Sequence, residues 1–490
     1  MENHDTNFTI SPRDAEWRLR LRQSMTARQR SDIPRAVMPE LPPEYRVATM
    51  HAEVNQGLSA DAAVTEATRC LDCPEPGCVG GCPVGINIPG FIKNIERRNF
   101  ADAAATLRQT SALPAVCGRV CPQEKQCESR CVYNKMGKPP VAIGWLERFA
   151  ADNDAPQTDL PGREAANGLR VAVVGSGPAG LSFAGDMARK GYNVTVFEAL
   201  HEIGGVLKYG IPEFRLPNRV VDREIDALKA LGVKFETNVL FGKTYSSDDL
   251  LARGFHGIFV ASGAGLPRFM GIPGENLIGV MSSNEYLTRI NLMGAGQPGY
   301  ATPVLTGRTV AVIGGGNTAM DSVRTARRMG ATRAIIVYRR SEQEMPARVE
   351  EVKHAKEEGV EFLTLHNPVE YKADSTGRVC SMTLQRMELG EPDASGRRSP
   401  VAVEGALTKL PVDLVIVSVG VSPNPLVPSS VDGLETTRRG TLAVDDDLRT
   451  TVPFIYAGGD IVRGGATVIL AMGDGRKAAA AMHRALSHAD

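Results

Sequence analysis

The sequence has no long apolar run and no excess of charge of either sign. No segment approaches the roughly 18 apolar residues that a membrane-spanning helix needs, and residues 1–23 are polar, without the apolar core of a secretory signal. Lys plus Arg and Asp plus Glu both total 56, which gives no reason to expect nucleic acid or an anionic membrane as a partner. We therefore expect a cytoplasmic protein that acts on small molecules.

The 490 residues exceed one ordinary hydrophobic core, and the length suggests about three domains. Residues 1–165 contain polar, helix-prone stretches and are expected to form an α-helical domain. A linker-like stretch, residues 152–168, precedes an apolar strand expected over residues 169–174. Beyond it, glycine-rich turns alternate with β-branched runs and helices, which is typical of α/β folds with doubly wound parallel sheets.

The first glycine-rich turn, VAVVGSGPAG at residues 171–180, follows an apolar strand and opens a helix. The spacing G-x-G-x-x-G permits a tight turn, close approach of the backbone to a pyrophosphate, and tight packing of helix on strand. The next strand ends in an acid that can accept hydrogen bonds from ribose hydroxyls. The predicted dinucleotide site consists of Gly175, Ser176, Gly177, Pro178, Ala179, Gly180 and Glu198.

Near the C-terminus, IYAGGDI places an aspartate after a strand and a glycine pair. This segment resembles the second FAD fingerprint of flavoproteins with two dinucleotide domains, in which the matching aspartate binds the ribityl chain. The resemblance makes FAD the ligand of the first site, and EIGGVLKYGIPEFRLP at residues 202–217 is expected to continue that site. The additional FAD residues it implies are Gly205, Leu207, Arg215, Gly459, Asp460, Ala466 and Thr467.

The second glycine-rich turn, VAVIGGGNTA at residues 310–319, has the tolerated variant G-x-G-x-x-A. The next strand ends in two arginines where NAD sites place an acid, and guanidinium groups there can pair with a 2′-phosphate. NADPH is therefore favoured over NADH, although the two arginines could instead solvate the strand end. The predicted residues are Gly314, Gly316, Asn317, Thr318, Ala319, Arg339, Arg340 and Arg348.

These two sites predict two Rossmann-like dinucleotide-binding domains, one inserted in the other, so that hydride can pass from NADPH to the flavin. We expect the FAD domain to comprise residues 166–303 and 421–490 and the NADPH domain residues 304–420. Thioredoxin reductases share this plan but carry C-x-x-C in the inserted domain, where this chain has only Cys380. We therefore do not expect disulfide reduction.

Eight of the nine cysteines lie between Cys70 and Cys131. A cluster of this kind in a chain without a secretory signal indicates metal binding, since closely spaced thiolates need a cation to neutralise them. Zinc would fill two four-cysteine sites. Iron–sulfur clusters also use a short C-x2-C and a Cys-Pro, and a flavin domain would supply them with electrons. We favour iron–sulfur over zinc, and zinc over disulfides.

Together, the cysteine string, GRVCPQEKQCESRC, VVGSGPAG, EIGGVLKYGIPEFRLP, VIGGGNTAMD and YAGGD resemble the NADPH-glutamate synthase small (β) subunit family, whose architecture also forms the N-terminal part of dihydropyrimidine dehydrogenase. The resemblance implies an α-helical iron–sulfur domain with two 4Fe–4S clusters. One cluster would use Cys70, Cys73, Cys78 and Cys131; the other would use Cys82, Cys121, Cys127 and Glu147. This assignment leaves Cys117 spare, although spacing alone would make it a ligand.

Glutamate synthesis from glutamine and 2-oxoglutarate also needs a glutaminase and a site that reduces an imine. The resembling amidotransferases use an N-terminal cysteine, whereas residue 2 is Glu2 and no cysteine precedes Cys70. No room remains for an FMN barrel, so a large subunit is expected as partner. The alternative is the large subunit of an NADH-dependent ferredoxin:NADP oxidoreductase or a sulfide-dehydrogenase-type enzyme, with a ferredoxin-reductase-like partner. A zinc-binding scaffold without enzymatic activity is the alternative of another class.

Overall fold

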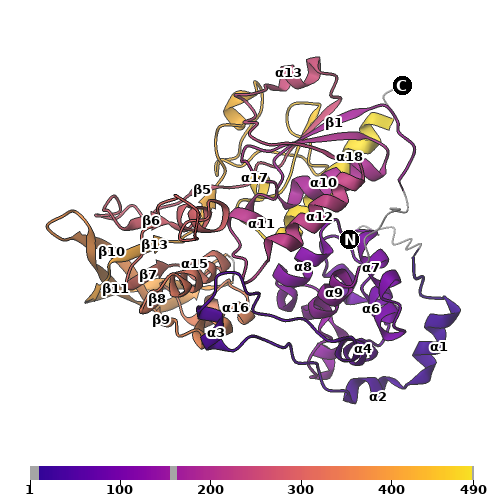
Figure 1. Cartoon of the computed structure of the whole chain (residues 1–490), viewed down its shortest axis with the longest axis horizontal. Helices are drawn as coiled ribbons and strands as arrows, with labels where there is room; N and C mark the ends of the chain where they lie inside the picture. The colour runs from indigo at the N-terminus through magenta and orange to yellow at the C-terminus, as the bar shows by residue number, and fades with distance from the viewer. Residues whose placement is uncertain (1–9, 155–162, 395, 488–490) are drawn as a thin grey trace.

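The computed structural model describes residues 10–154, 163–394 and 396–487, and it arranges them in three lobes (Figure 1). Glu2 and residues 155–162 of the expected linker lie outside this range. The N-terminal lobe is α-helical, as the sequence predicts. Its helices are α1 (Glu16–Ser24), α2 (Ala27–Asp32), α3 (Pro43–Val47), α4 (Ala60–Thr68), α5 (Gly77–Gly80), α6 (Ile88–Glu96), α7 (Phe100–Arg108), α8 (Pro114–Val120) and α9 (Ile143–Asp152).

The upper lobe of Figure 1 is built on a parallel sheet with strand order β15-β4-β1-β2-β3. The strands are β1 (Arg170–Val174), β2 (Asn193–Phe197), β3 (Lys234–Glu236), β4 (Gly257–Val260) and β15 (Ile455–Ala457). Helix α10 (Pro178–Arg189) follows β1 directly and packs against the C-terminal helix α18 (Val468–Ser487). The lobe also contains α11 (Val206–Tyr209), α12 (Asn218–Ala230), α13 (Ser247–Ala252) and α17 (Asp460–Arg463).

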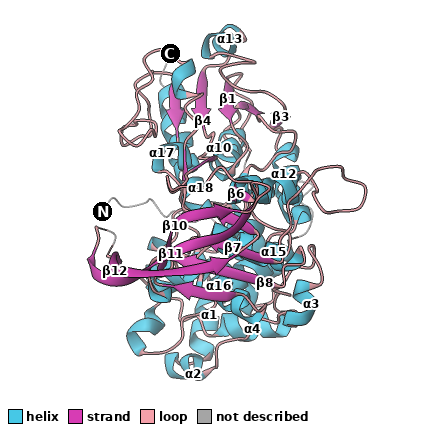
Figure 2. Ribbon diagram, turned by 90° about the vertical axis from the view of Figure 1, so that its left-hand side faces the viewer, coloured by secondary structure: helices cyan, strands magenta, loops and turns pink. Residues whose placement is uncertain are grey.

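The third lobe has a second parallel sheet, with strand order β6-β13-β7-β8-β9, and an antiparallel sheet, β10-β11-β12, that lies beside it (Figure 2). The parallel strands are β6 (Val280–Ser282), β7 (Thr309–Ile313), β8 (Arg333–Tyr338), β9 (Glu361–Thr364) and β13 (Leu414–Val417). The antiparallel strands are β10 (His366–Ala373), β11 (Val379–Pro392) and β12 (Arg398–Pro411), and the helices are α14 (Ser283–Leu287), α15 (Asn317–Arg328) and α16 (Val349–Glu357).

The boundary between the two sheets differs from the expected one at residue 304. Strand β6 pairs in parallel with β13, so residues 280–282 belong to the second sheet. The chain crosses between the lobes at a small antiparallel pair, β5 (Leu266–Pro267) with β14 (Val421–Ser422). The inserted domain therefore begins earlier than the glycine motif suggests, because a three-residue strand carries too little hydrophobic pattern to be recognised.

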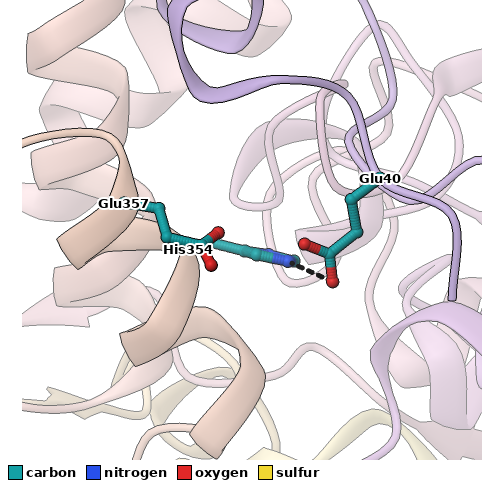
Figure 3. Close-up of side chains that lie close together, drawn as sticks. All are labelled: Glu40, His354 and Glu357. Atoms are coloured by element: carbon teal, nitrogen blue, oxygen red, sulfur yellow. Dashed lines mark ion pairs between the residues drawn. The ribbon is translucent and has the colours of Figure 1, made fainter. Parts of the chain in front are cut away.

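A segment of the N-terminal lobe crosses to α16 of the third lobe, where Glu40, His354 and Glu357 lie close together (Figure 3). Glu40 Oε1 lies 3.3 Å from His354 Nε2 and 2.9 Å from Lys353 Nζ. Arg46 contacts Glu40 Oε2 at 2.9 Å and Glu357 Oε2 at 2.7 Å. Contact with His354 and Lys353 lowers the pKa of Glu40 to about 2. Because Arg46 and Lys353 already neutralise these carboxylates, we interpret the group as an ion-paired contact between lobes, not a metal site.

None of the helices in the described residues combines the length and the apolarity that crossing a bilayer requires.

Candidate functional site

A continuous cleft of about 2080 Å³ runs between the two parallel sheets. Ordinary ligand pockets measure roughly 300–1000 Å³, so this cleft has room for more than one large ligand. Most residues predicted for the two dinucleotide sites line it: Gly175, Ser176, Gly177, Pro178, Ala179, Glu198, Gly205, Arg215, Gly459, Asp460, Ala466, Thr467, Gly314, Gly316, Asn317, Thr318, Arg339 and Arg340.

The glycines of the first turn have the three roles that the fingerprint requires. Gly175 has φ +101°, and a side chain there would lie 2.5 Å from the carbonyl oxygen of Ala261. A Cβ on Gly180 would meet the carbonyl oxygen of Gly175 at 2.0 Å, so this residue keeps helix α10 tight against β1. A Cβ on Gly177 would meet nothing within 4 Å. Its backbone therefore opens into the cleft at the start of a helix, where a pyrophosphate can bind.

Two acidic side chains of the predicted FAD site line the cleft. Glu198 ends β2 and is 6% exposed; its Oε2 accepts from Ser176 N at 2.9 Å, and its Oε1 accepts from Leu200 N at 2.9 Å. Asp460 lines the cleft at the start of α17, and burial raises its pKa to about 6. Carboxylates in these two positions can accept hydrogen bonds from sugar or ribityl hydroxyls.

In the second turn, Gly316 again opens into the cleft, with Pro346 Cγ 4.0 Å from where a Cβ would be. Of the two arginines at the end of β8, Arg339 is exposed and Arg340 is 6% exposed. Arg340 Nη2 pairs with Asp393 Oδ2 at 2.6 Å, and its Nε donates to the carbonyl oxygen of Arg398 at 2.7 Å. Both contacts lie at the turn between β11 and β12.

Four of the predicted residues do not line the cleft: Gly180, Leu207, Ala319 and Arg348. Leu207 and Ala319 are fully buried in the hydrophobic cores. Arg348 is 5% exposed and faces the N-terminal lobe, where its guanidinium donates to Arg119 O at 2.7 Å and to Gln123 Oε1 at 2.9 Å. Because these contacts occupy Arg348, the structure gives it an interdomain position and not one beside the cofactor phosphate.

Arg215 lines the cleft and also joins the two dinucleotide domains. Its Nη1 donates to Asp321 Oδ2 at 2.8 Å, and its Nε lies 3.3 Å from Glu351 Oε1. Both carboxylates belong to the inserted domain, and the three side chains are at most 6% exposed. Burial raises the pKa of Asp321, and the charge of Arg215 opposes that rise. A buried ion pair of this kind fixes how the two domains face each other.

Sequence reasoning did not single out Asp321, although VIGGGNTAMD ends with it. It also missed Tyr209, which lines the cleft between the two turns and whose pKa burial raises to about 12. The glycine fingerprint gives no signal for either residue. Only their position on α15 and α11, beside the turns, could have indicated them.

Two groups of cysteines can be distinguished in the N-terminal lobe. In the first, burial raises the pKa of Cys78, and the neighbouring thiolates of Cys70, Cys131 and Cys73 raise it further. These four cysteines are half-buried near the surface of the N-terminal lobe. Such a cluster of thiols suits a cation, since a positive charge among them favours the thiolate form.

The second group lines a small cavity between α6, α9 and the start of α18. Cys82, Cys121, Cys127 and Glu147 contribute to its wall, together with apolar residues such as Ile469. Glu147 is 5% exposed, its Oε1 has no hydrogen-bond partner within the described residues, and burial raises its pKa to about 8. An isolated buried carboxyl beside three thiols is costly without a compensating cation, so this donor set fits a metal cluster.

Cys117 is fully buried but does not line this cavity. Its Sγ lies 3.5 Å from Met472 Sδ on α18. Its thiol also interacts with that of Cys121, so Cys117 lies between the second cysteine group and the C-terminal helix.

The chain resembles known proteins along nearly its whole length. A family model described as dihydropyrimidine dehydrogenase domain II, 4Fe-4S cluster, matches residues 46–158, and one described as pyridine nucleotide-disulphide oxidoreductase matches residues 169–476. The chain is 38% identical over 457 residues to the glutamate synthase (NADPH) small chain of Azospirillum brasilense, which covers 91% of this chain and 94% of that one.

A second relative is the NADP(+)-dependent formate dehydrogenase subunit beta of Moorella thermoacetica, 39% identical over 436 residues; the alignment covers 84% of this chain and 60% of that one. Among solved structures, Mycobacterium tuberculosis FprA in complex with NADPH matches with a TM-score of 0.56 and 21% identity, covering 66% of this chain and 85% of that one. This match shows a shared fold.

Proposed function

The chain belongs to the glutamate synthase small-chain family of NADPH-dependent flavin and iron–sulfur oxidoreductases, and we propose that it supplies electrons from NADPH to a larger subunit that makes glutamate from glutamine and 2-oxoglutarate. When bound, FAD accepts hydride from NADPH and can release electrons singly to the iron–sulfur clusters. The role of this chain's residues is to bind NADPH, FAD and the clusters close enough together for these transfers.

One observation carries the proposal: the second cysteine group adjoins the cleft. Cys121 contributes to the cavity of that group, while its two neighbours in sequence, Val120 and Pro122, line the cleft. The start of α18 does the same, since Ile469 lines the cavity and Val468 lines the cleft. A flavin and a cluster on either side of these residues would be separated by little more than one layer of side chains.

We propose that the second cluster is held by Cys82, Cys121, Cys127 and Glu147, and the first by Cys70, Cys73, Cys78 and Cys131. The buried, unpartnered Oε1 of Glu147 and the absence of Cys117 from the cavity wall support this set over one with a fourth cysteine. A carboxylate ligand would shift the potential of that cluster and help to order electron flow. The first group is nearer the surface, which suits it to pass electrons onward.

In the flavin half of the cleft, we assign the ribose to Glu198, the pyrophosphate to the turn at Gly177, and the ribityl chain to Asp460. In the other half, we assign the pyrophosphate of NADPH to the turn at Gly316 and its 2′-phosphate to the basic end of β8. Arg339 is exposed in the cleft there, and a cation at this strand end favours NADPH over NADH. The proposed thiolate ligands require a reducing compartment, so we propose a cytoplasmic location.

We infer the partner from a relative that the alignment covers almost completely. The glutamate synthase small chain is covered to 94% by the alignment, whereas the formate dehydrogenase subunit is covered to 60%. The test is to assay the purified chain, with NADPH, for glutamate formed from glutamine and 2-oxoglutarate, with and without a glutamate synthase large subunit. We expect reduction of artificial acceptors by the chain alone and glutamate only with the large subunit. Glutamate from the chain alone, or none from the pair, would refute the proposal.

A further inference from the structure

The basic end of β8 has fewer available cations than the sequence suggests. Arg340, one of the two arginines expected at the 2′-phosphate, is almost fully buried against the turn between β11 and β12. Its guanidinium pairs with Asp393 at 2.6 Å, and the carboxylate is 29% exposed. This ion pair has two effects: it occupies Arg340, and it neutralises an acid that would otherwise repel a phosphate.

The same turn brings another arginine into the cleft. Arg397 lies at the turn, with its backbone oxygen accepting from Asp393 N at 2.7 Å, and it lines the cleft together with Arg339 and Arg340. Arg397 therefore contributes to the wall of the cleft, although it lies far from the glycine motif in sequence. In Figure 2 the long strands β11 and β12 extend along the third lobe toward this turn.

The antiparallel sheet is also fixed to the end of β8 through the backbone. Leu365 N donates to the carbonyl oxygen of Arg340 at 3.1 Å, and Met387 N on β11 donates to the carbonyl oxygen of Leu365 at 2.7 Å. Arg340 Nε adds a bond to the carbonyl oxygen of Arg398, the first residue of β12. The contacts of Arg340 anchor Asp393 and Arg398, which lie on either side of Arg397 in the sequence, and this lowers the conformational entropy lost when Arg397 binds a ligand.

We propose that Arg397, together with Arg339, contacts the 2′-phosphate of NADPH, and that Arg340 is a positioning residue that holds the turn bearing Arg397. This inference rests on the proposed use of NADPH in the cleft. Because Arg340 is paired with Asp393, Arg397 supplies the second positive charge beside the phosphate. Two guanidinium groups from different elements can grip the phosphate from two sides and distinguish it from the 2′-hydroxyl of NADH.

The test measures binding of 2′,5′-ADP and of 5′-AMP to the full chain by titration calorimetry, so that activity is not the only readout. The two probes differ at the 2′-phosphate. Arg397→Ala should weaken the binding of 2′,5′-ADP roughly ten- to a hundredfold, which is typical for loss of a charge-assisted hydrogen bond. The affinity for 5′-AMP should not change. Arg378→Ala is the matched control, because Arg378 is exposed at the turn on the other end of β11 and does not line the cleft.

A double-mutant cycle separates the roles of the two arginines. If Arg340 acts through the position of Arg397, Arg340→Ala alone weakens the binding of 2′,5′-ADP. In a chain that already carries Arg397→Ala, the same substitution causes little further loss of affinity. Additive losses would overturn the positioning role. Equal affinities of Arg397→Ala and Arg378→Ala for 2′,5′-ADP would overturn the role of Arg397. If the unchanged chain binds 2′,5′-ADP no better than 5′-AMP, the proposed use of NADPH fails instead, and this inference fails with it.

Discussion

Replacing Arg215 should separate two roles that its position allows: binding the flavin directly, or aligning the two dinucleotide domains. In Arg215→Met, Asp321 loses the guanidinium that contacts it at 2.8 Å, while Glu351 keeps Arg324. Removing one partner of a buried ion pair costs about 3–5 kcal/mol, and about 1.4 kcal/mol corresponds to a factor of ten. Other contacts between the lobes, such as those of Arg46 and Arg348, remain. We therefore expect flavin reduction by NADPH to slow by at least about tenfold, without separation of the domains.

The assay is anaerobic stopped-flow reduction of the flavin, by NADPH and separately by dithionite. Dithionite needs no alignment of the domains, so its rate should be unchanged in Arg215→Met. The double variant Arg215→Met with Asp321→Asn removes the uncompensated carboxylate and should recover part of the NADPH rate. Arg219→Met, whose side chain is 76% exposed, is the control and should behave as the unchanged chain. Loss of bound flavin in both Arg215 variants, with no recovery, would show that Arg215 binds FAD directly and refute alignment as its main role.

Two further predictions concern the cofactor sites. Cys117→Ser should retain about eight iron atoms per chain, because Cys117 packs on Met472 and does not line the cavity. Glu147→Ala should lose iron and alter the electron paramagnetic resonance signal of one cluster. The opposite result for the two variants would exchange the roles of Cys117 and Glu147. Burial raises the pKa of Asp460 from 3.8 to about 6, so its ionisation destabilises the FAD-free fold as pH rises through this range, by up to about 3 kcal/mol. Asp460→Asn should therefore raise the thermal midpoint of FAD-free protein more at pH 8 than at pH 5 while weakening FAD binding, and an equal gain at both pH values would contradict this cause.

The sequence was sufficient to predict those structural features that depend on a few residues close together in the chain. The turn at Gly175 to Gly180 has the strand, positive φ and helix that its spacing requires, because backbone sterics within one turn determine them. The α-helical character of the N-terminal lobe could be predicted for similar reasons.

Contacts between distant segments could not be predicted in this way. Arg215 and Asp321 are 106 residues apart, and Arg340 and Asp393 are 53 apart. Both pairs depend on how whole domains and a hairpin pack, which no local window of sequence specifies. The assignment of Arg348 to the cofactor phosphate failed to anticipate its contacts with Arg119 and Gln123 for the same reason.

The central claim is that electrons leave the cleft through the second cysteine group toward a larger subunit. The most direct measurement compares Cys82→Ala with Cys380→Ala, an exposed cysteine on β11, in two assays. One assay follows flavin reduction by NADPH, and the other follows glutamate formation in the presence of the large subunit. We expect Cys82→Ala to reduce its flavin at the rate of the unchanged chain but to form almost no glutamate, while Cys380→Ala is normal in both. Glutamate formation by Cys82→Ala at the unchanged rate would contradict the account.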